Sequence, residues 1–197
     1  MKSKKDCVRR LNATSLLVFS LFSILSLLCW NKVMAEQPPS DKGDHVATGG
    51  DLAFMNDAAP GGAAEVAFGQ MAMTKGAKSE VREFGQKMVA DHSKAGKELE
   101  ALADAKGVSL SSQLMPAHRE LKAKLAELSG ADFDRAYVLA MVTAHKKDVA
   151  AFQAVAKNAT DADVKTFAAN TLPTLEMHLQ MIQALAAKMG VKPDKDQ

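Results

Sequence analysis

Three histidines and one glutamate have the residue types and the spacing that could form a metal site. His92, His145 and His178 each fall on the apolar stripe of a different predicted long helix, and Glu65 lies among small residues on a fourth. All four are near mid-helix, roughly 10 to 14 residues from a helix end at about 1.5 Å per residue. Imidazole nitrogens with a carboxylate suit a divalent transition metal. We therefore predict that the four side chains converge and bind one such ion, or copper.

Further carboxylates stand beside these histidines. Asp91 precedes His92, and Glu176 lies two residues before His178. Either carboxylate could bind the ion directly or accept a hydrogen bond from a ring N–H. The opposite interpretation needs no ion, because buried histidines often form hydrogen bonds with carboxylates in a core. A metal-free network of the same residues is therefore the alternative hypothesis.

Methionines flank the histidines and raise the question of copper. They are Met88, Met141, Met177 and Met181. Soft thioethers beside imidazoles favour Cu(I), but methionine also fills irregular gaps in cores with few aromatic residues. The pattern is thus compatible with a copper site and with ordinary core packing.

The helices that must position these residues are predicted from the amino-acid composition and from the residues that typically begin or end helices. From residue 51 onward the chain is rich in Ala, Leu, Met and Lys and has no strand-like alternation, which is typical of an all-α fold. Gly, Pro, Ser and Thr positions divide it into four long helices, at about residues 51–75, 79–106, 131–157 and 160–189. Pro116 begins a short extra helix between the second and third, and APGG at residues 59–62 should break or kink the first. We expect an antiparallel four-helix bundle.

Two of the predicted helices resemble each other. REFGQKMVADHSKAGKEL and RAYVLAMVTAHKKDVAAF align at an offset of 53 residues, so that Met88 and His92 match Met141 and His145. This internal similarity suggests two related helical hairpins joined end to end. The two histidines would then occupy equivalent places in the bundle.

The N-terminal segment has the parts of an export signal. A basic start, MKSKKDCVRR, precedes an apolar stretch, and VMA at residues 33–35 offers small residues for cleavage. We expect residues 1–35 to be a signal peptide, 36–50 a disordered linker, 51–190 the bundle domain and 191–197 a polar tail. The protein would then reside in the periplasm or outer envelope. An uncleaved leader that anchors the chain in the membrane is the alternative.

Cleavage of this leader changes the composition of the protein. Both cysteines, Cys7 and Cys29, lie within residues 1–35, so the mature domain has no thiol to serve as ligand or nucleophile. Its 19 Lys and Arg residues are outnumbered by 22 Asp and Glu, which argues against a basic nucleic-acid surface. No glycine loop that binds phosphate and no other catalytic motif is found. We expect neither a nucleic-acid partner nor enzyme activity.

Four long segments carry a family resemblance. They are FMNDAAPGGAAEVAFGQMA, VREFGQKMVADHSKA, LSGADFDRAYVLAMVTAHKKDVAAF and FAANTLPTLEMHLQMI. With these segments, which cover most of residues 51–186, the chain resembles the exported, alanine-rich proteins of domain-of-unknown-function family 4142. The resemblance implies an export signal and a ferritin-like four-helix bundle whose biochemical role is unassigned. All four candidate site residues fall within the matching segments.

One feature separates this sequence from di-iron proteins of the wider ferritin-like group. Those proteins take a Glu-x-x-His pair from each of two helices, and no Glu of this chain has a His three residues later. We therefore expect a mononuclear or histidine-rich site rather than a carboxylate-bridged di-iron centre.

The sequence as a whole predicts an exported envelope protein, a ferritin-like bundle that binds a metal ion or an envelope protein partner and serves in stress tolerance. The alternative is a metal-free structural or interaction module with a buried His/Glu network. A redox enzyme that uses a bound metal is a third interpretation. We expect contact with a membrane only if the leader stays uncleaved.

Overall fold

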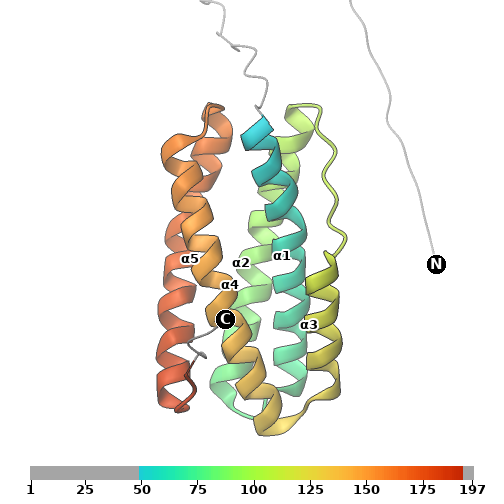
Figure 1. Cartoon of the computed structure of the whole chain (residues 1–197), viewed down its shortest axis with the longest axis vertical. Coiled ribbons are helices and arrows are strands. Elements are labelled where there is room, and N and C mark those ends of the chain that lie inside the picture. The colour runs from blue at the N-terminus through green and yellow to red at the C-terminus, as the bar shows by residue number, and fades with distance from the viewer. Residues whose placement is uncertain (1–48, 193–197) are drawn as a thin grey trace, which may run out of the picture. The chain divides into compact units, whose positions relative to one another are not determined.

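The computed structural model describes residues 49–192, and its regular secondary structure is helical throughout this range (Figure 1). The helices are α1 (Gly49–Lys75), α2 (Ser79–Ala105), α3 (Pro116–Glu127), α4 (Gly130–Asn158) and α5 (Ala162–Lys188). The predicted all-α fold, with a short helix between the second and third long ones, is confirmed. The predicted signal peptide, most of the linker and most of the polar tail lie outside the described residues.

The four long helices pack side by side as two hairpins (Figure 1). The most extensive contacts join α1 to α2 and α4 to α5, and fewer contacts join α2 to α5 and α1 to α4. Gly76 at the end of α1 pairs with Gly130 at the start of α4, and Lys188 near the end of α5 pairs with Glu80 at the start of α2. Neighbouring long helices therefore run antiparallel, whereas α2 and α4 run in the same direction at diagonal corners.

The parallel course of α2 and α4 requires the chain to return along the whole bundle between them. Residues 106–129, which include α3, make this crossover (Figure 1), and one long crossover is a feature of ferritin-like bundles. At its lower end, Lys75 Nζ donates to the Leu128 carbonyl at 2.9 Å. The buried Asp134 carboxylate near the start of α4 accepts from the backbone N–H of Ala77 and Lys78, both at 2.9 Å, and joins α4 to the turn between α1 and α2.

The internal similarity does not correspond to two duplicated hairpins. A tandem duplication would match α2 with α5, because each is the second helix of its hairpin. The offset of 53 residues instead matches α2 with α4, the second helix of one hairpin with the first of the other. The two similar segments are equivalent in direction and in height, and they face each other across the bundle.

The expected break in the first helix is also absent, since α1 continues through Pro60, Gly61 and Gly62. Tertiary packing explains this result. Met55 before the proline and Phe68 after it are both buried, so contacts on either side stabilise one helix despite its poor local propensity. Within residues 49–192, no helix is both long enough and apolar enough to cross a membrane.

The hydrophobic core is divided into two clusters. One contains Phe68, Phe84, Tyr137 and other buried residues near the end at which α1 finishes. The second, near the opposite end, is built around Met55 and Leu99 and neighbouring side chains. Between the two clusters the helices turn polar side chains inward, and these form the candidate site.

Candidate metal centre

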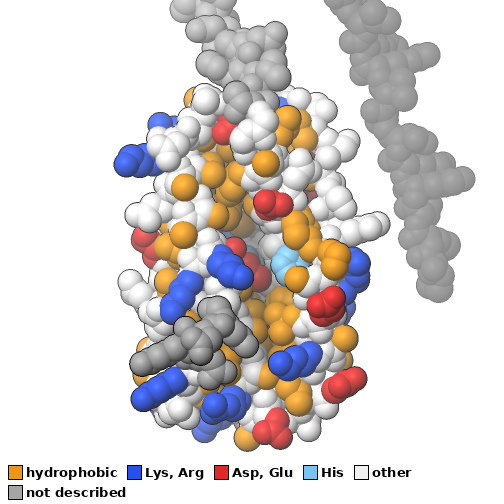
Figure 2. All heavy atoms as spheres, in the orientation of Figure 1, with side chains coloured by type: hydrophobic (Ala, Val, Ile, Leu, Met, Phe, Trp, Pro, Cys, Tyr) orange, Lys and Arg blue, Asp and Glu red, His pale blue; other side chains and the backbone are white. Residues whose placement is uncertain are grey.

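Each long helix contributes one of the four predicted residues to the layer between the core clusters. Glu65 comes from α1, His92 from α2, His145 from α4 and His178 from α5. Their exposed fractions are 6%, 7%, 0% and 0%, in that order. The four side chains therefore lie beneath the surface, where Figure 2 shows charged side chains scattered among exposed hydrophobic ones. Helical spacing therefore placed all four side chains in the same layer of the interior.

The three histidine rings form a nearly equilateral triangle. Their ring centroids are 5.7 Å apart for His92 and His145, and 5.4 Å apart for each of the pairs that include His178. One ring nitrogen from each histidine lies within 4.8 Å of one nitrogen from each of the others. Three rings on three helices thus direct nitrogen atoms toward a common space.

On α2, His92 is oriented by the carboxylate of Glu65. Its Nδ1 lies 3.0 Å from Glu65 Oε2, so Nδ1–H donates to the carboxylate across the α1 and α2 contact. This bond fixes the tautomer of the neutral ring. The lone pair of His92 is consequently on Nε2.

The orientation of His145 depends on its own helix. Its Nδ1 lies 3.0 Å from the backbone carbonyl oxygen of Met141, one turn earlier on α4. A carbonyl oxygen can only accept, so Nδ1 carries the hydrogen and Nε2 the lone pair. Glu65 Oε1, at 3.5 Å from the same Nδ1, lies on the same side of the ring.

In His178 the ring nitrogen that donates a hydrogen bond is Nε2 rather than Nδ1. Its Nε2 lies 2.8 Å from Asp91 Oδ2, and Asp91 in turn pairs with Lys87 Nζ at 3.0 Å. Asp91 was predicted either as a ligand or as an acceptor for a ring N–H, and in the structure it is an acceptor for His178. The lone pair of His178 is therefore on Nδ1.

The three nitrogens that remain have no hydrogen-bond partner. They are His92 Nε2, His145 Nε2 and His178 Nδ1, and all three are buried. Buried polar atoms are normally satisfied, and a histidine that binds a metal normally donates its other N–H to a carboxylate or backbone carbonyl. All three histidines have this arrangement.

Electrostatics keeps the three rings neutral. Burial, together with the neighbouring His145 and His178, lowers the pKa of His92 to about 3. Burial likewise lowers the pKa of His145 to about 4, although its bond to Met141 opposes the shift. The pKa of His178 is lowered by burial against the opposing effect of Asp91. At neutral pH the histidines are therefore in the deprotonated form that binds metals.

Glu65 was predicted as a ligand, but its carboxylate faces the Nδ1 atoms of His92 and His145 rather than their unpartnered nitrogens. Asp148, which the sequence interpretation missed, faces the same carboxylate. Burial and Asp148 raise the pKa of Glu65, and burial raises the pKa of Asp148 to about 6. The signal for Asp148 was its position three residues after His145, on the same face of α4. Glu65, His145 and Asp148 form a second group of closely spaced ligand atoms.

The side chains of the remaining predicted neighbours are exposed or belong to the hydrophobic core. Glu176 is exposed, and Met177 and Met181 are 38% and 40% exposed on α5. Met88 and Met141 are fully buried in the core cluster at the end where α1 finishes. The buried pair fits the interpretation of methionine as a core residue.

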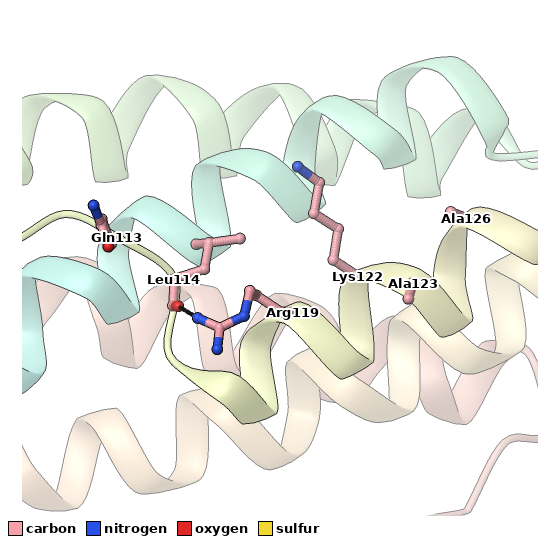
Figure 3. Close-up of a pocket in the computed structure, with 6 residues that line it drawn as sticks. All are labelled: Gln113, Leu114, Arg119, Lys122, Ala123 and Ala126. Atoms are coloured by element: carbon pink, nitrogen blue, oxygen red, sulfur yellow. Dashed lines mark hydrogen bonds between the residues drawn. The ribbon is translucent and has the colours of Figure 1, made fainter.

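Two pockets lie near α2 and α3. One, of about 370 Å³, has His92 in its wall and is bounded by α1, α2 and the crossover. The other, of about 620 Å³, lies on α3 and includes Leu114, Arg119 and Lys122 (Figure 3). In it the Arg119 guanidinium donates to the Leu114 carbonyl (Figure 3). Only the smaller pocket touches the histidine triad.

Comparison with known proteins identifies the family. A model of the domain of unknown function DUF4142 matches residues 36–185. The chain belongs to this family. The resemblance inferred from the four sequence segments is thereby confirmed. No curated protein matches the chain.

Two crystal structures share the fold of this DUF4142 domain. A DUF305 protein from Streptomyces coelicolor superposes with a TM-score of 0.63 and 17% identity, over 73% of this chain and 96% of that one. A DUF305 fragment from Deinococcus radiodurans gives a TM-score of 0.64 and 15% identity, over 72% and 98% of the two chains. At these identities the likeness concerns the fold alone.

Proposed function

We propose that this protein binds one divalent transition metal ion through His92 Nε2, His145 Nε2 and His178 Nδ1. The observation that carries the proposal is the set of three buried ring nitrogens without partners, each on a ring whose other nitrogen is already hydrogen bonded. Three neutral imidazoles suit Zn, Cu, Fe or Ni. Three protein ligands also leave a fourth tetrahedral position for water or another small ligand.

The surrounding residues support the ligands in this proposal. Glu65, the Met141 carbonyl and Asp91 each accept one ring N–H, which orients the ring and raises the basicity of the nitrogen that binds the ion. Glu65 is thus proposed as an orienting residue rather than a ligand. Its carboxylate, together with Asp148, would also offset the positive charge of an ion in this buried layer.

A metal-free polar network is the competing explanation, and proton counting disfavours it. A hydrogen bond between two histidines needs one N–H and one lone pair. Because each ring N–H already has an acceptor outside the triad, no histidine has an N–H left to donate to the lone pair of another. An ion satisfies all three lone pairs at once, whereas the rings alone satisfy none.

The proposed cellular location is outside the cytoplasm. The leader-like residues 1–35 support export, and the DUF305 structural neighbour from Streptomyces coelicolor is described as a protein inferred to be secreted. We propose that the protein binds its ion in the envelope. The proposal includes no catalytic reaction.

The test is metal content and metal-dependent stability of the purified protein. After chelator treatment, Zn²⁺ or Cu²⁺ should bind with one ion per chain and raise the melting temperature, because a ligand of the folded state stabilises it by mass action. His145→Ala should abolish both effects. His118→Ala on α3 is the matched control, because this histidine lies outside the triad, and it should bind like the parent. The proposal is wrong if Zn²⁺, Cu²⁺, Ni²⁺ and Fe²⁺ all leave the parent protein unchanged.

A further inference from the structure

The pocket of about 370 Å³ lies next to the candidate metal centre. His92 on α2 forms part of its wall, and Ala59 and Ala63 on α1 line it from the opposite side. Leu110, from the crossover segment between α2 and α3, also lines it. His92 is 7% exposed, whereas His145 and His178 are 0% exposed. The triad is therefore closest to solvent on the side of this pocket.

Small side chains keep this pocket open. Besides the two alanines, its wall includes Ser93 and Gly96, which follow His92 on α2. A Cβ atom at Gly96 would meet nothing within 4 Å, although glycine inside a helix normally lowers stability relative to alanine. At this position the missing side chain leaves open space directly one turn from His92.

The pocket is large enough for a hydrated cation, and its mainly apolar wall carries a few polar groups. Its volume is about 370 Å³, whereas six water molecules occupy about 180 Å³ at about 30 Å³ each. Ser93, Ser112 and Glu100 supply polar groups on its wall. Glu100 is exposed and carries a carboxylate that attracts cations, while Lys97 beside it carries the opposite charge.

We infer that this pocket is the route by which the metal ion reaches and leaves the histidine triad, with Gly96 as the residue that keeps the route open. The inference rests on the proposed metal binding and adds the path that the ion takes to the site. On this path the ion passes between α1, α2 and the crossover segment and meets His92 first. His145 and His178 then complete its coordination.

The experiment measures the rates of metal loading and removal in the full-length protein. Co²⁺ serves as the probe because its absorption reports coordination by nitrogen ligands. Stopped-flow mixing gives the loading rate, and excess chelator gives the release rate. In Gly96→Leu, where the new side chain occupies the pocket, both rates should fall at least tenfold while the equilibrium affinity stays within threefold of the parent. Gly61→Leu on α1 is the control, since Gly61 also has open space around its Cβ position but does not line the pocket, and its rates should be unchanged.

A second variant tests the route by widening the pocket instead of blocking it. Leu110→Ala widens the pocket on the crossover side and should accelerate loading and release together. Unchanged rates in Gly96→Leu with intact affinity would overturn the inference, and if that variant does not fold, unchanged rates in Leu110→Ala decide against it. The failure of the proposed function looks different, because the parent protein would then bind no Co²⁺ at all.

Discussion

His92 and His145 lie on α2 and α4, which run in the same direction at opposite corners of the bundle, and their ring centroids are 5.7 Å apart. Each follows a methionine by four residues in similar segments. Both rings turn Nδ1 toward an acceptor and leave Nε2 buried without a partner. The repeated motif therefore supplies two equivalent ring nitrogens from opposite sides, and His178 on α5 adds the third.

Replacing the carboxyl group of Glu65 by an amide should weaken metal binding without abolishing it. Glu65→Gln keeps an acceptor near His92 but lowers the basicity of the ring, and loss of such an orienting partner typically reduces metal affinity about 10- to 100-fold. Titration calorimetry with Zn²⁺ measures the effect. Glu98→Gln, at an exposed residue that pairs with Lys94 at 3.9 Å, is the control and should bind like the parent. Equal affinity of the two variants would refute the orienting role of Glu65.

Lys87 contacts Asp91, which contacts His178, and Asp91 should contribute more to metal affinity than Lys87. Asp91→Ala leaves His178 Nε2–H without its acceptor at 2.8 Å and should lower Zn²⁺ affinity about tenfold or more. Lys87→Ala removes a partly exposed ion pair of 3.0 Å and should matter much less, because solvent screens such pairs. Competition with a coloured chelator gives both affinities. A larger loss in Lys87→Ala than in Asp91→Ala would contradict this order.

The close crossing of α1 and α2 predicts opposite effects for two glycine substitutions. A Cβ at Gly69 would lie 2.7 Å from the carbonyl oxygen of Gly85, so Gly69→Ala must separate the helices and should cost about 1–3 kcal/mol of stability. Gly96→Ala meets no atom within 4 Å and should stabilise the protein by about 0.5–1 kcal/mol. Urea unfolding of the two variants measures both values. Destabilisation by Gly96→Ala, or none by Gly69→Ala, would show that the helices are spaced differently.

The metal-free protein should lose stability as the pH falls from 7 to 5. Folded-state pKa values of about 3 for His92 and about 4 for His145 lie below the unfolded value of about 6.5. The unfolded state thus binds more protons in this window, and stability that is complete above about pH 6.5 is lost on acidification. His178 shifts in the same direction.

Carboxyl groups that face these histidines oppose the trend in part. The raised pKa values of Asp148 and Glu65 mean that the folded state binds protons there first, which adds stability at lower pH. We expect the loss from the histidines to prevail, because their unfolded-state pKa of about 6.5 lies inside this pH window. Urea unfolding at pH 7, 6 and 5 in the presence of a chelator measures it. Greater stability at pH 5 than at pH 7 would contradict the neutral, buried histidines.

The sequence alone determined the helices and the four inward residues of the candidate site. Residues that begin or end helices located the long helices and the short one at Pro116. A period of 3.6 residues places Met88 and His92 on one face of their helix, whatever the helix packs against. The number of residues between each side chain and the end of its helix placed Glu65, His92, His145 and His178 at the same level along the bundle. These are local properties of a helix, so they can be read without knowledge of its neighbours.

Tertiary structure decided how those residues are used. Periodicity fixes the direction of a Cβ atom, but the rotation of each ring depends on the acceptor that packing supplies from α1, from α2 or from its own helix. For the same reason Glu65 faces two Nδ1 atoms, Asp148 joins it, and α1 continues through Pro60. The crossover that makes α2 and α4 parallel, and the pocket beside His92, arise from contacts between segments far apart in the chain. No pattern within a single helix encodes such contacts, because they exist only once all four helices have packed together.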